Sequence, residues 1–183
     1  MPRAMTPFWW PALCMSWGLP EPISVAFCPD GPPSSGAIER SWRSLWGMSD
    51  RTLVLLKPDA VERGLVGVIL SRFETKGLHI AAMELRTLDA AILARHYEEH
   101  VGKGFYADLV AFMGRGPVVA LAIEGPEDTW EIVRTMMGAT NPRKADLGTI
   151  RGDYGTLFTE NLVHGSDSAE SAARELGIFF PAL

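Results

Sequence analysis

The order of strand-like and helix-like segments from residue 52 onward limits the possible fold more than any other feature of this sequence. The apolar run TLVLLK (52–57) is ended by Pro58 and predicts a buried strand. Further along, LVGVILSRFETKG (65–77) has apolar side chains at helical spacing and ends on Gly77, a residue type that often caps helices. The chain is expected to form strands at 52–57, 79–88, 117–125 and 161–164, and helices at 65–77, 89–100, 105–113, 126–137 and 168–180.

Four strands separated by helices predict an α/β (α+β) domain. Their order is that of a ferredoxin-like split βαβ repeat, in which helices cover a four-stranded antiparallel sheet. One segment falls outside this pattern, because the polar, glycine-rich stretch 138–160 is longer than a simple connection requires. Loops of this length are usually functional or flexible, so this stretch is a candidate part of a functional site.

The first 48 residues differ in composition from the rest of the chain. They hold five of the six tryptophans and eight of the thirteen prolines, and they show no hydrophobic period of 2 or 3.6. A secretory signal is one alternative, but Pro7 and Pro11 interrupt its apolar region and no small-residue cleavage site follows. We expect residues 1–48 to be a disordered extension, or the product of a start codon assigned too early. Residues 49–183 are expected to form the single folded domain.

Composition also argues against several classes of protein. The formal net charge is -5 and there is no long run of lysine or arginine, so dedicated nucleic-acid binding is not expected. No stretch approaches the roughly 20 apolar residues of a membrane-spanning helix. The two cysteines, Cys14 and Cys28, both lie in the extension, so the domain has no disulfide and no thiolate metal ligand. These features favour a reducing, cytoplasmic location without a membrane partner.

The segment NLVHGSDS (161–168) contains the strongest candidate for a reactive residue. His164 ends the last expected strand and is followed by hydroxyl and carboxylate side chains at the start of a helix, where anions bind readily. Gly165 removes a side chain beside the imidazole, which would let a bulky ligand approach. An imidazole beside a phosphate-binding pocket can act as a nucleophile. The alternative is a structural or exposed histidine, which is common at the end of a strand.

Three cations are candidates for holding an anion near this histidine. Lys57 lies where Pro58 turns the chain at the end of the first strand, Arg134 lies in a helix, and Arg151 lies between glycines in the long loop. Taken singly, each is more typical of a solvated surface charge. Together they offer the guanidinium forks and the ammonium that phosphate recognition uses. The usual phosphate loop, GxxxxGK[ST], is absent from the sequence, as is GxGxxG after a strand.

Several short motifs resemble the nucleoside diphosphate kinase family. The most specific is NLVHGSDS, and the match continues in register over nearly the whole expected domain, from about residue 52 to residue 180. The first 48 residues are not covered. The other matching motifs are KPDAV (57–61), HYEEH with GKGFY (96–106), GPVVALAIEG (116–125), GATNP (138–142) and GTIRGDYG (148–155).

The resemblance implies an enzyme that transfers the γ-phosphoryl group of a nucleoside triphosphate, mainly ATP, to a nucleoside diphosphate. In this family the reaction is a ping-pong cycle, and the histidine of the NxxHGSDS motif carries the phosphoryl group. His164 would therefore be the nucleophile and form a pros-phosphohistidine. Such a transfer requires mainly in-line positioning and charge neutralisation.

The same resemblance assigns roles to further residues. Lys57 would contact the ribose and the γ-phosphate region, Asn161 would hold the ribose 3′-OH, and Tyr97 would line the pocket. Ser166 and Glu175 would support the histidine by hydrogen bonding.

Nucleotide binding involves a second implied set. Arg134, Thr140 and Arg151 would grip the phosphates, while Phe105 would stack on the base with Leu109 alongside. The pattern alone favours the alternative that Phe105 and Leu109, four residues apart on a helix, are core residues.

Magnesium is the expected cofactor. Mg²⁺ would arrive bridging the β and γ phosphates, with Asp167 as the nearest carboxylate, directly or through water.

Two departures from the family pattern leave questions open. Phe158 stands where a smaller apolar residue would face the base, so it could improve stacking or narrow the slot. The sequence ends with FFPAL (179–183), and many relatives have a longer C-terminal segment that helps subunits to associate. The resemblance implies a homo-oligomer, either a tetramer or a hexamer.

Two other functions are alternatives to the kinase. A nucleotide-sensing or protein-interaction module could use the same scaffold without catalysis. It would be expected to have lost His164, Lys57 or Arg151, and all three are present. A nucleic-acid-binding sheet would require exposed aromatic residues with basic surroundings, whereas these strands are apolar and the chain is acidic.

Overall fold

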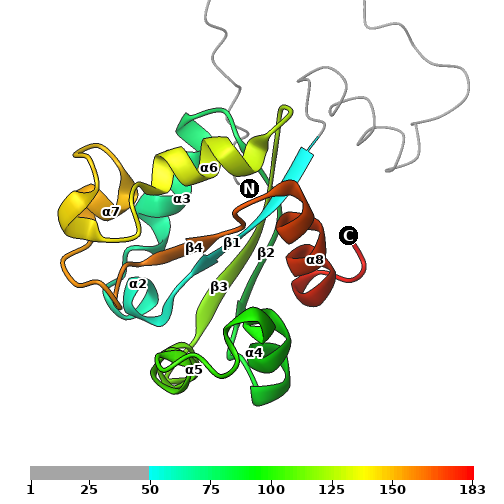
Figure 1. Ribbon diagram of the computed structural model, residues 1–183. Helices are drawn as coiled ribbons and strands as arrows, with labels where there is room; N and C mark the ends of the chain where they lie inside the picture. Colours follow the sequence, from blue (N-terminus) through cyan, green and yellow to red (C-terminus); the bar gives the residue numbers. More distant parts are fainter. Residues whose placement is uncertain (1–49) are drawn as a thin grey trace, which may run out of the picture. The chain divides into compact units, whose positions relative to one another are not determined.

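The computed structural model describes residues 50–183, which form one four-stranded antiparallel sheet with the strand order β2-β3-β1-β4 (Figure 1). This confirms the predicted fold class. The prediction for residues 1–48 lies outside the described residues and stays a prediction. The strands are β1 (Asp50–Leu56), β2 (His79–Arg86), β3 (Val118–Gly125) and β4 (Val163–Gly165).

Helices pack against both faces of the sheet and form two apolar clusters. One cluster joins α3, α6 and α7 to the face that carries Val54 and Leu56, and the other joins α4, α5 and α8 to the face that carries Leu53 and Leu55. In the described part of the chain, no helix is both long and apolar enough to cross a membrane. The helices are α2 (Pro58–Glu62), α3 (Val66–Thr75), α4 (Ala90–His96), α5 (Tyr106–Gly114), α6 (Thr129–Met137), α7 (Ile150–Tyr154) and α8 (Ala169–Phe179), with 3₁₀ turns η1 (Glu98–His100) and η2 (Pro142–Lys144).

The central strand β1 explains why its sequence is apolar without alternation. Successive side chains of a strand point to opposite faces, and helices cover both faces here. The segment from residue 53 to residue 56 is therefore completely buried. This strand pairs with β3 on one side and β4 on the other, so His164 on β4 lies opposite Leu55.

Two short helices were not predicted. Pro58 does not merely end β1, because it occupies the first turn of α2, where a missing N–H costs nothing. The long segment 138–160 is also partly regular, since it contains η2 and α7. The side chain of Thr149 accepts a hydrogen bond from the Gly152 backbone and so caps α7. This capped turn fixes the position of Arg151.

Helix α6 and strand β4 have bounds that differ from the prediction, for local reasons of backbone conformation. Helix α6 begins at Thr129 and not at Pro126, because Asp128 just before it has a left-handed backbone with φ of 59°. The last strand is shorter than predicted, because Leu162 also has a positive φ, 72°, and breaks the extended run NLVH. Ser168, the first residue of the helix predicted at 168–180, caps α8 by accepting a hydrogen bond from the Ser171 backbone.

Candidate active site

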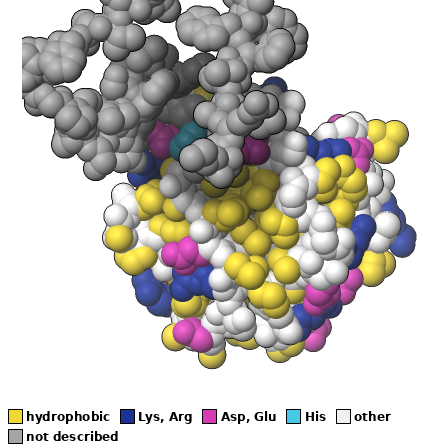
Figure 2. Space-filling view, turned by 180° about the vertical axis from the view of Figure 1, so that it is seen from behind, with side chains coloured by type: hydrophobic (Ala, Val, Ile, Leu, Met, Phe, Trp, Pro, Cys, Tyr) yellow, Lys and Arg dark blue, Asp and Glu magenta, His cyan; other side chains and the backbone are white. Residues whose placement is uncertain are grey.

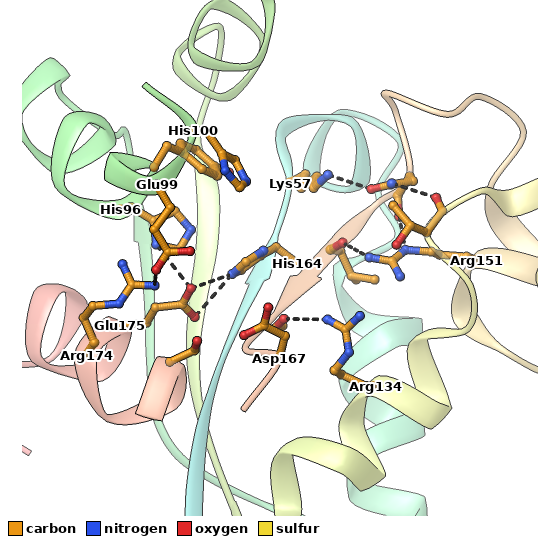
Figure 3. Close-up of a pocket in the computed structure, with 16 residues that line it drawn as sticks. Lys57, His96, Glu99, His100, Arg134, Arg151, His164, Asp167, Arg174 and Glu175 are labelled. Atoms are coloured by element: carbon orange, nitrogen blue, oxygen red, sulfur yellow. Dashed lines mark hydrogen bonds and ion pairs between the residues drawn. The ribbon is translucent and has the colours of Figure 1, made fainter. Parts of the chain in front are cut away.

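A pocket of about 230 Å³ lies where β4, α8 and the α4–η1 segment meet the start of α2 and the long loop (Figure 3). His164 projects from β4 into this pocket. Residues far apart in the sequence therefore converge here. The pocket brings together these predicted site residues: Lys57, Tyr97, Arg134, Thr140, Arg151, Asn161, His164, Asp167 and Glu175.

The hydrogen bonds of His164 determine which ring nitrogen carries the free lone pair. Its Nε2 lies 3.2 and 3.3 Å from the two carboxylate oxygens of Glu175, and the Ser166 hydroxyl donates to the same carboxylate at 2.6 Å. An ionised carboxylate can only accept hydrogen bonds, so the proton resides on Nε2. No described residue donates to or accepts from Nδ1. The network therefore leaves the lone pair on Nδ1.

Glu175 is ionised although it is buried. Burial alone would raise the pKa of its carboxyl group, but the hydrogen bond from His164, the charge of that imidazole and the hydrogen bond from Ser166 outweigh burial and lower the pKa to about 2. The carboxylate is thus a fixed acceptor at neutral pH. The predicted supporting pair, Ser166 and Glu175, is in contact with the histidine's network, although Ser166 does not itself line the pocket.

A tight turn at Leu162 places Asn161 beside the histidine strand. The Val163 N–H donates to the Asn161 carbonyl at 2.8 Å across Leu162, whose φ is 72°. This is a γ-turn of the strained type with positive φ. The turn is held from α2, because the Leu162 N–H donates to Asp59 at 3.1 Å and the Leu162 carbonyl accepts from the Lys57 N–H at 2.8 Å.

Lys57 is not the solvated strand-end lysine that its position in the sequence allows. Only 8% of the residue is exposed, and its Nζ donates to Asn161 Oδ1 at 2.6 Å. Burial and then the positive charge of Arg151 lower the pKa of Lys57, Asp59 opposes both effects, and the net result is a pKa of about 8. A bound anion would therefore stabilise the charged form of Lys57.

The two arginines differ in how freely they can bind a ligand. Arg151 is buried and donates to the carbonyl groups of Asn161, Gly138 and Val163. Burial, and then the charge of Arg134, lowers the pKa of Arg151 to about 10. Arg134 makes one longer hydrogen bond, to the Gly165 carbonyl at 3.3 Å. Arg151 thus combines a structural role with an uncompensated charge, and Arg134 is the freer of the two.

Thr140 and Tyr97 complete the predicted lining of the pocket. The Thr140 carbonyl accepts from the side-chain amide of Asn161 at 3.0 Å, which fixes the orientation of that amide. Tyr97 is buried at the end of α4, and burial followed by the charge of Glu175 raises the pKa of its hydroxyl. The phenol is therefore neutral at physiological pH and cannot act as an anion.

The predicted base-binding residues are not part of this pocket. Phe105 immediately precedes α5, is 52% exposed, and contacts the His100 ring edge-on at a centroid distance of 5.5 Å. Leu109 packs against the second apolar cluster, in agreement with the core alternative. Phe158 is also exposed, at 65%. An exposed aromatic residue next to the pocket remains available for stacking.

The explanation given for Gly165 is wrong. A Cβ atom there would lie 2.7 Å from Met137 Sδ and 3.4 Å from Val133 Cγ1, on the side of the strand that packs against α6. The glycine allows close helix–sheet packing, because a side chain at this position would press on the Met137 side chain of α6. It does not clear the space for a ligand.

Sequence reasoning missed several lining residues. His96 and His100 belong to the HYEEH motif, of which only Tyr97 is among the predicted site residues. Glu99, from the same motif, forms an ion pair with Arg174 at 3.1 Å on the rim of the pocket. The two histidines are four residues apart, a spacing that places side chains on the same face of a helix, and this was the signal available in the sequence. Arg174 precedes Glu175, and its chain position alone gave no reason to select it.

Asp167 is exposed and forms no hydrogen bond or ion pair with the described residues. The other two carboxylates of the pocket are engaged, Glu99 by Arg174 and Glu175 by His164. One free carboxylate beside several cations suits a magnesium ion that keeps most of its waters and binds chiefly to substrate phosphates. The residues present therefore fit a metal that arrives with a nucleotide.

These features describe a class of protein, an α+β fold in which a histidine and several cations line one pocket, an arrangement suited to a phosphotransferase. Comparison with known proteins names the family. Residues 50–183 match the family model described as nucleoside diphosphate kinase. The chain therefore belongs to the nucleoside diphosphate kinase family, which confirms the resemblance and the prediction of a kinase.

Individual relatives agree with this assignment. A nucleoside diphosphate kinase from a Nocardioides species is 62% identical over 136 residues, which are 74% of this chain and 100% of the relative. One from Streptomyces avermitilis is 62% identical over 135 residues, 73% of this chain and 98% of the relative. Among solved structures, the Halobacterium salinarum enzyme in complex with CDP has a TM-score of 0.69 at 45% identity, covering 72% of this chain and 87% of that chain.

Proposed function

We propose that this protein transfers the γ-phosphoryl group of ATP and other nucleoside triphosphates to nucleoside diphosphates, through a phosphohistidine on Nδ1 of His164. The observation that carries the assignment of the nucleophile is the bond between Nε2 and the Glu175 carboxylate, because it leaves the lone pair on Nδ1. Family membership supports the overall reaction. The nearby cations Lys57, Arg134 and Arg151 support the binding of phosphates.

The reaction has two halves. In the first, the Nδ1 lone pair attacks the γ-phosphorus, the bond from phosphorus to the bridging oxygen breaks, and the nucleoside diphosphate leaves with the electron pair. In the second, a terminal phosphate oxygen of another nucleoside diphosphate attacks the phosphohistidine, and the breaking N–P bond returns its electrons to Nδ1. Throughout, Glu175 keeps the proton on Nε2 and stabilises the positive charge that develops on the imidazole.

The other pocket residues bind and orient the substrate. Arg134, Arg151 and Thr140 hold the phosphates, and Lys57 with Asn161 holds the ribose hydroxyl and the transferring group, since this pair is already joined at 2.6 Å. Mg²⁺ bound to the substrate phosphates, with Asp167 as the nearest carboxylate, would neutralise phosphate charge.

We propose that Phe105 stacks on the base with Leu109 beside it. Stacking on an exposed aromatic ring is indifferent to the hydrogen-bonding edges of the base, so broad nucleotide specificity follows. The ring lies at the mouth of the pocket through its contact with His100, a lining residue.

We also propose a cytoplasmic homo-oligomer. Strand β2 is an edge of the sheet and exposes Met83 and Leu85, at 55% and 67%. Figure 2 shows hydrophobic side chains gathered on the face seen from behind. An exposed apolar edge strand is suited to pairing with another chain. The mass of the purified protein, measured by light scattering, tests the assembly, and a monomer at all concentrations would contradict it.

The test of the kinase assignment is labelling with γ-³²P-ATP and Mg²⁺, followed by a chase with unlabelled GDP. We expect a label that is acid-labile and base-stable and that moves to GTP. His164→Gln should abolish labelling, whereas His79→Gln, at an exposed position on β2, should not change it. A folded protein that binds ATP but takes up no label would favour the nucleotide-sensing alternative. A label that survives in His164→Gln would place the nucleophile elsewhere.

A further inference from the structure

His96 is a buried polar residue of the pocket for which the phosphoryl transfer proposed above gives no role. It lies at the end of α4 with 4% of its surface exposed, and neither ring nitrogen has a hydrogen-bond partner among the described residues. Buried polar atoms without partners are rare, because their lost hydration is not replaced. His96 also lines the pocket, beside His164 and Glu175.

The donor atoms of these three residues form a compact group. His164 Nε2 lies 3.2 Å from Glu175 Oε1, and His96 Nδ1 lies 3.8 Å from the same oxygen, too far for a hydrogen bond. One ligand atom from each residue lies within 4.8 Å of the other two, and the histidine rings are nearly perpendicular, at 84°. A tetrahedral zinc ion with bonds of about 2.0–2.2 Å separates its ligand atoms by roughly 3.4 Å. A small contraction of the group would therefore accommodate the ion.

The chemistry of the group selects the kind of ion. Two imidazole nitrogens and one carboxylate are ligands of zinc and its neighbours, whereas magnesium prefers oxygen ligands and retains its waters. The ligands also have the protonation that a metal requires. Burial, and then the charge of His164, lowers the pKa of His96 to about 3, so its imidazole is neutral and keeps a free lone pair at neutral pH.

We propose that His96, His164 and Glu175 form an inhibitory Zn²⁺ site, with water from the pocket as the fourth ligand. The inhibition rests on the phosphohistidine function proposed above, while the metal site itself does not. Zinc on Nε2 of His164 displaces the proton from that nitrogen, and in a neutral imidazole the proton then resides on Nδ1. No proton is released, but the lone pair that would attack the phosphorus is lost. Zinc also binds the Glu175 carboxylate, which otherwise holds the imidazole proton on Nε2.

Binding can be tested on the whole, nucleotide-free protein without an activity assay. Titration with Co²⁺ should give the intense visible absorption of a tetrahedral ion at one equivalent, and Zn²⁺ should bleach it. In NMR spectra of protein labelled with ¹⁵N-histidine, Zn²⁺ should shift the ring signals of His96 and His164 and leave those of His79 unchanged. This second measurement needs no variant. Absence of a tetrahedral Co²⁺ band, or unshifted His96 signals, would overturn the proposal.

Variants then connect the ion to the reaction. Saturating Zn²⁺ in excess Mg²⁺ should lower the initial rate of phosphohistidine labelling by about tenfold or more, as expected for a wrong imidazole tautomer, and EDTA should restore it. His96→Asn should lose the Co²⁺ band and most of the sensitivity to Zn²⁺, whereas His79→Gln should behave as the wild type in both assays. Zinc that binds as tightly to His96→Asn would refute the ligand set. Absence of labelling before any zinc is added would count against the kinase proposal alone.

Discussion

Replacing Glu175 with glutamine changes one oxygen to an amide nitrogen while preserving the size and shape of the side chain. In the wild type, the carboxylate accepts from both the Ser166 hydroxyl and His164 Nε2. In the variant, the Ser166 hydroxyl can still donate to the amide oxygen. The amide nitrogen then faces Nε2 and can only donate, so Nε2 must become the acceptor and the imidazole proton moves to Nδ1.

The effect on stability follows from the pKa of this carboxyl group. Folding lowers it from the ordinary value of 4.5 to about 2. This difference of roughly 2.5 units corresponds to at most about 3 kcal/mol of stability from the ionised form. A lowered folded-state pKa stabilises above the unfolded-state value. The contribution is therefore fully present near pH 7 and is lost as the pH falls from about 4.5 toward 2. Glu175→Gln should lack it at all pH values, and its unfolding free energy should approach that of the wild type in acid.

The effect on activity should be larger than the effect on folding. A histidine held in the wrong tautomer loses on the order of 10⁴ in rate in a well-studied hydrolase triad, so a fall of about 10²–10⁴ in the first-half rate is expected here. Rapid-quench labelling with γ-³²P-ATP measures that rate directly. Glu170→Gln makes the same change of charge at an exposed position of α8 and serves as the control. If folded Glu175→Gln is labelled at the wild-type rate, the tautomer argument is wrong.

Three further predictions concern other parts of the pocket. Because the pKa of Lys57 is lowered to about 8, its ammonium loses the proton as the pH rises through that value, and kcat/KM for labelling should fall above about pH 8; a flat profile to pH 10 would contradict this. Gly165→Ala should lower the unfolding free energy by about 1–3 kcal/mol in denaturant titration, because the new methyl group meets Met137 at 2.7 Å; unchanged stability would show that α6 yields freely. Arg151→Lys should cost about 1–3 kcal/mol and also weaken nucleotide binding in calorimetry, because an ammonium cannot reach the three carbonyl groups that the guanidinium now joins; retention of both properties would show that the fork is dispensable.

The parts of the fold that follow from local patterns were predictable. The strand at 52–57 and the helix at 65–77 are marked by apolar spacing, and Ser168 is a standard helix cap. The pocket residues were reached differently, since the family motifs placed them in register without any knowledge of geometry. Neither source predicted α7, because its five residues are stabilised by the Thr149 cap and by the tertiary contacts of Arg151.

Long-range contacts account for what the sequence could not predict at the site. Lys57 is a predicted site residue, but its burial depends on Asn161, which is 104 residues away, so its sequence neighbours alone also allowed a solvated charge. Similarly, Gly165 was interpreted from the adjacent histidine, whereas the group that requires a glycine is Met137 on α6. The positive φ of Leu162 could not be predicted from residue preferences, which favour an extended backbone in this segment. Tertiary hydrogen bonds from α2 override that preference.

One carboxylate connects the proposed reaction with its proposed inhibition. The negative charge of Glu175 keeps the proton on Nε2 and so makes Nδ1 a nucleophile, but the same charge, next to a neutral His96, is what attracts a soft divalent cation. The two properties respond differently to substitution. Glu175 is needed for both, because it fixes the tautomer and ligates the metal. His96 contributes only to ligation in these proposals, and it makes no hydrogen bond to the histidine. A variant at position 96 that still takes up label but no longer responds to zinc would therefore separate sensitivity to the metal from catalysis, which no change at position 175 can do.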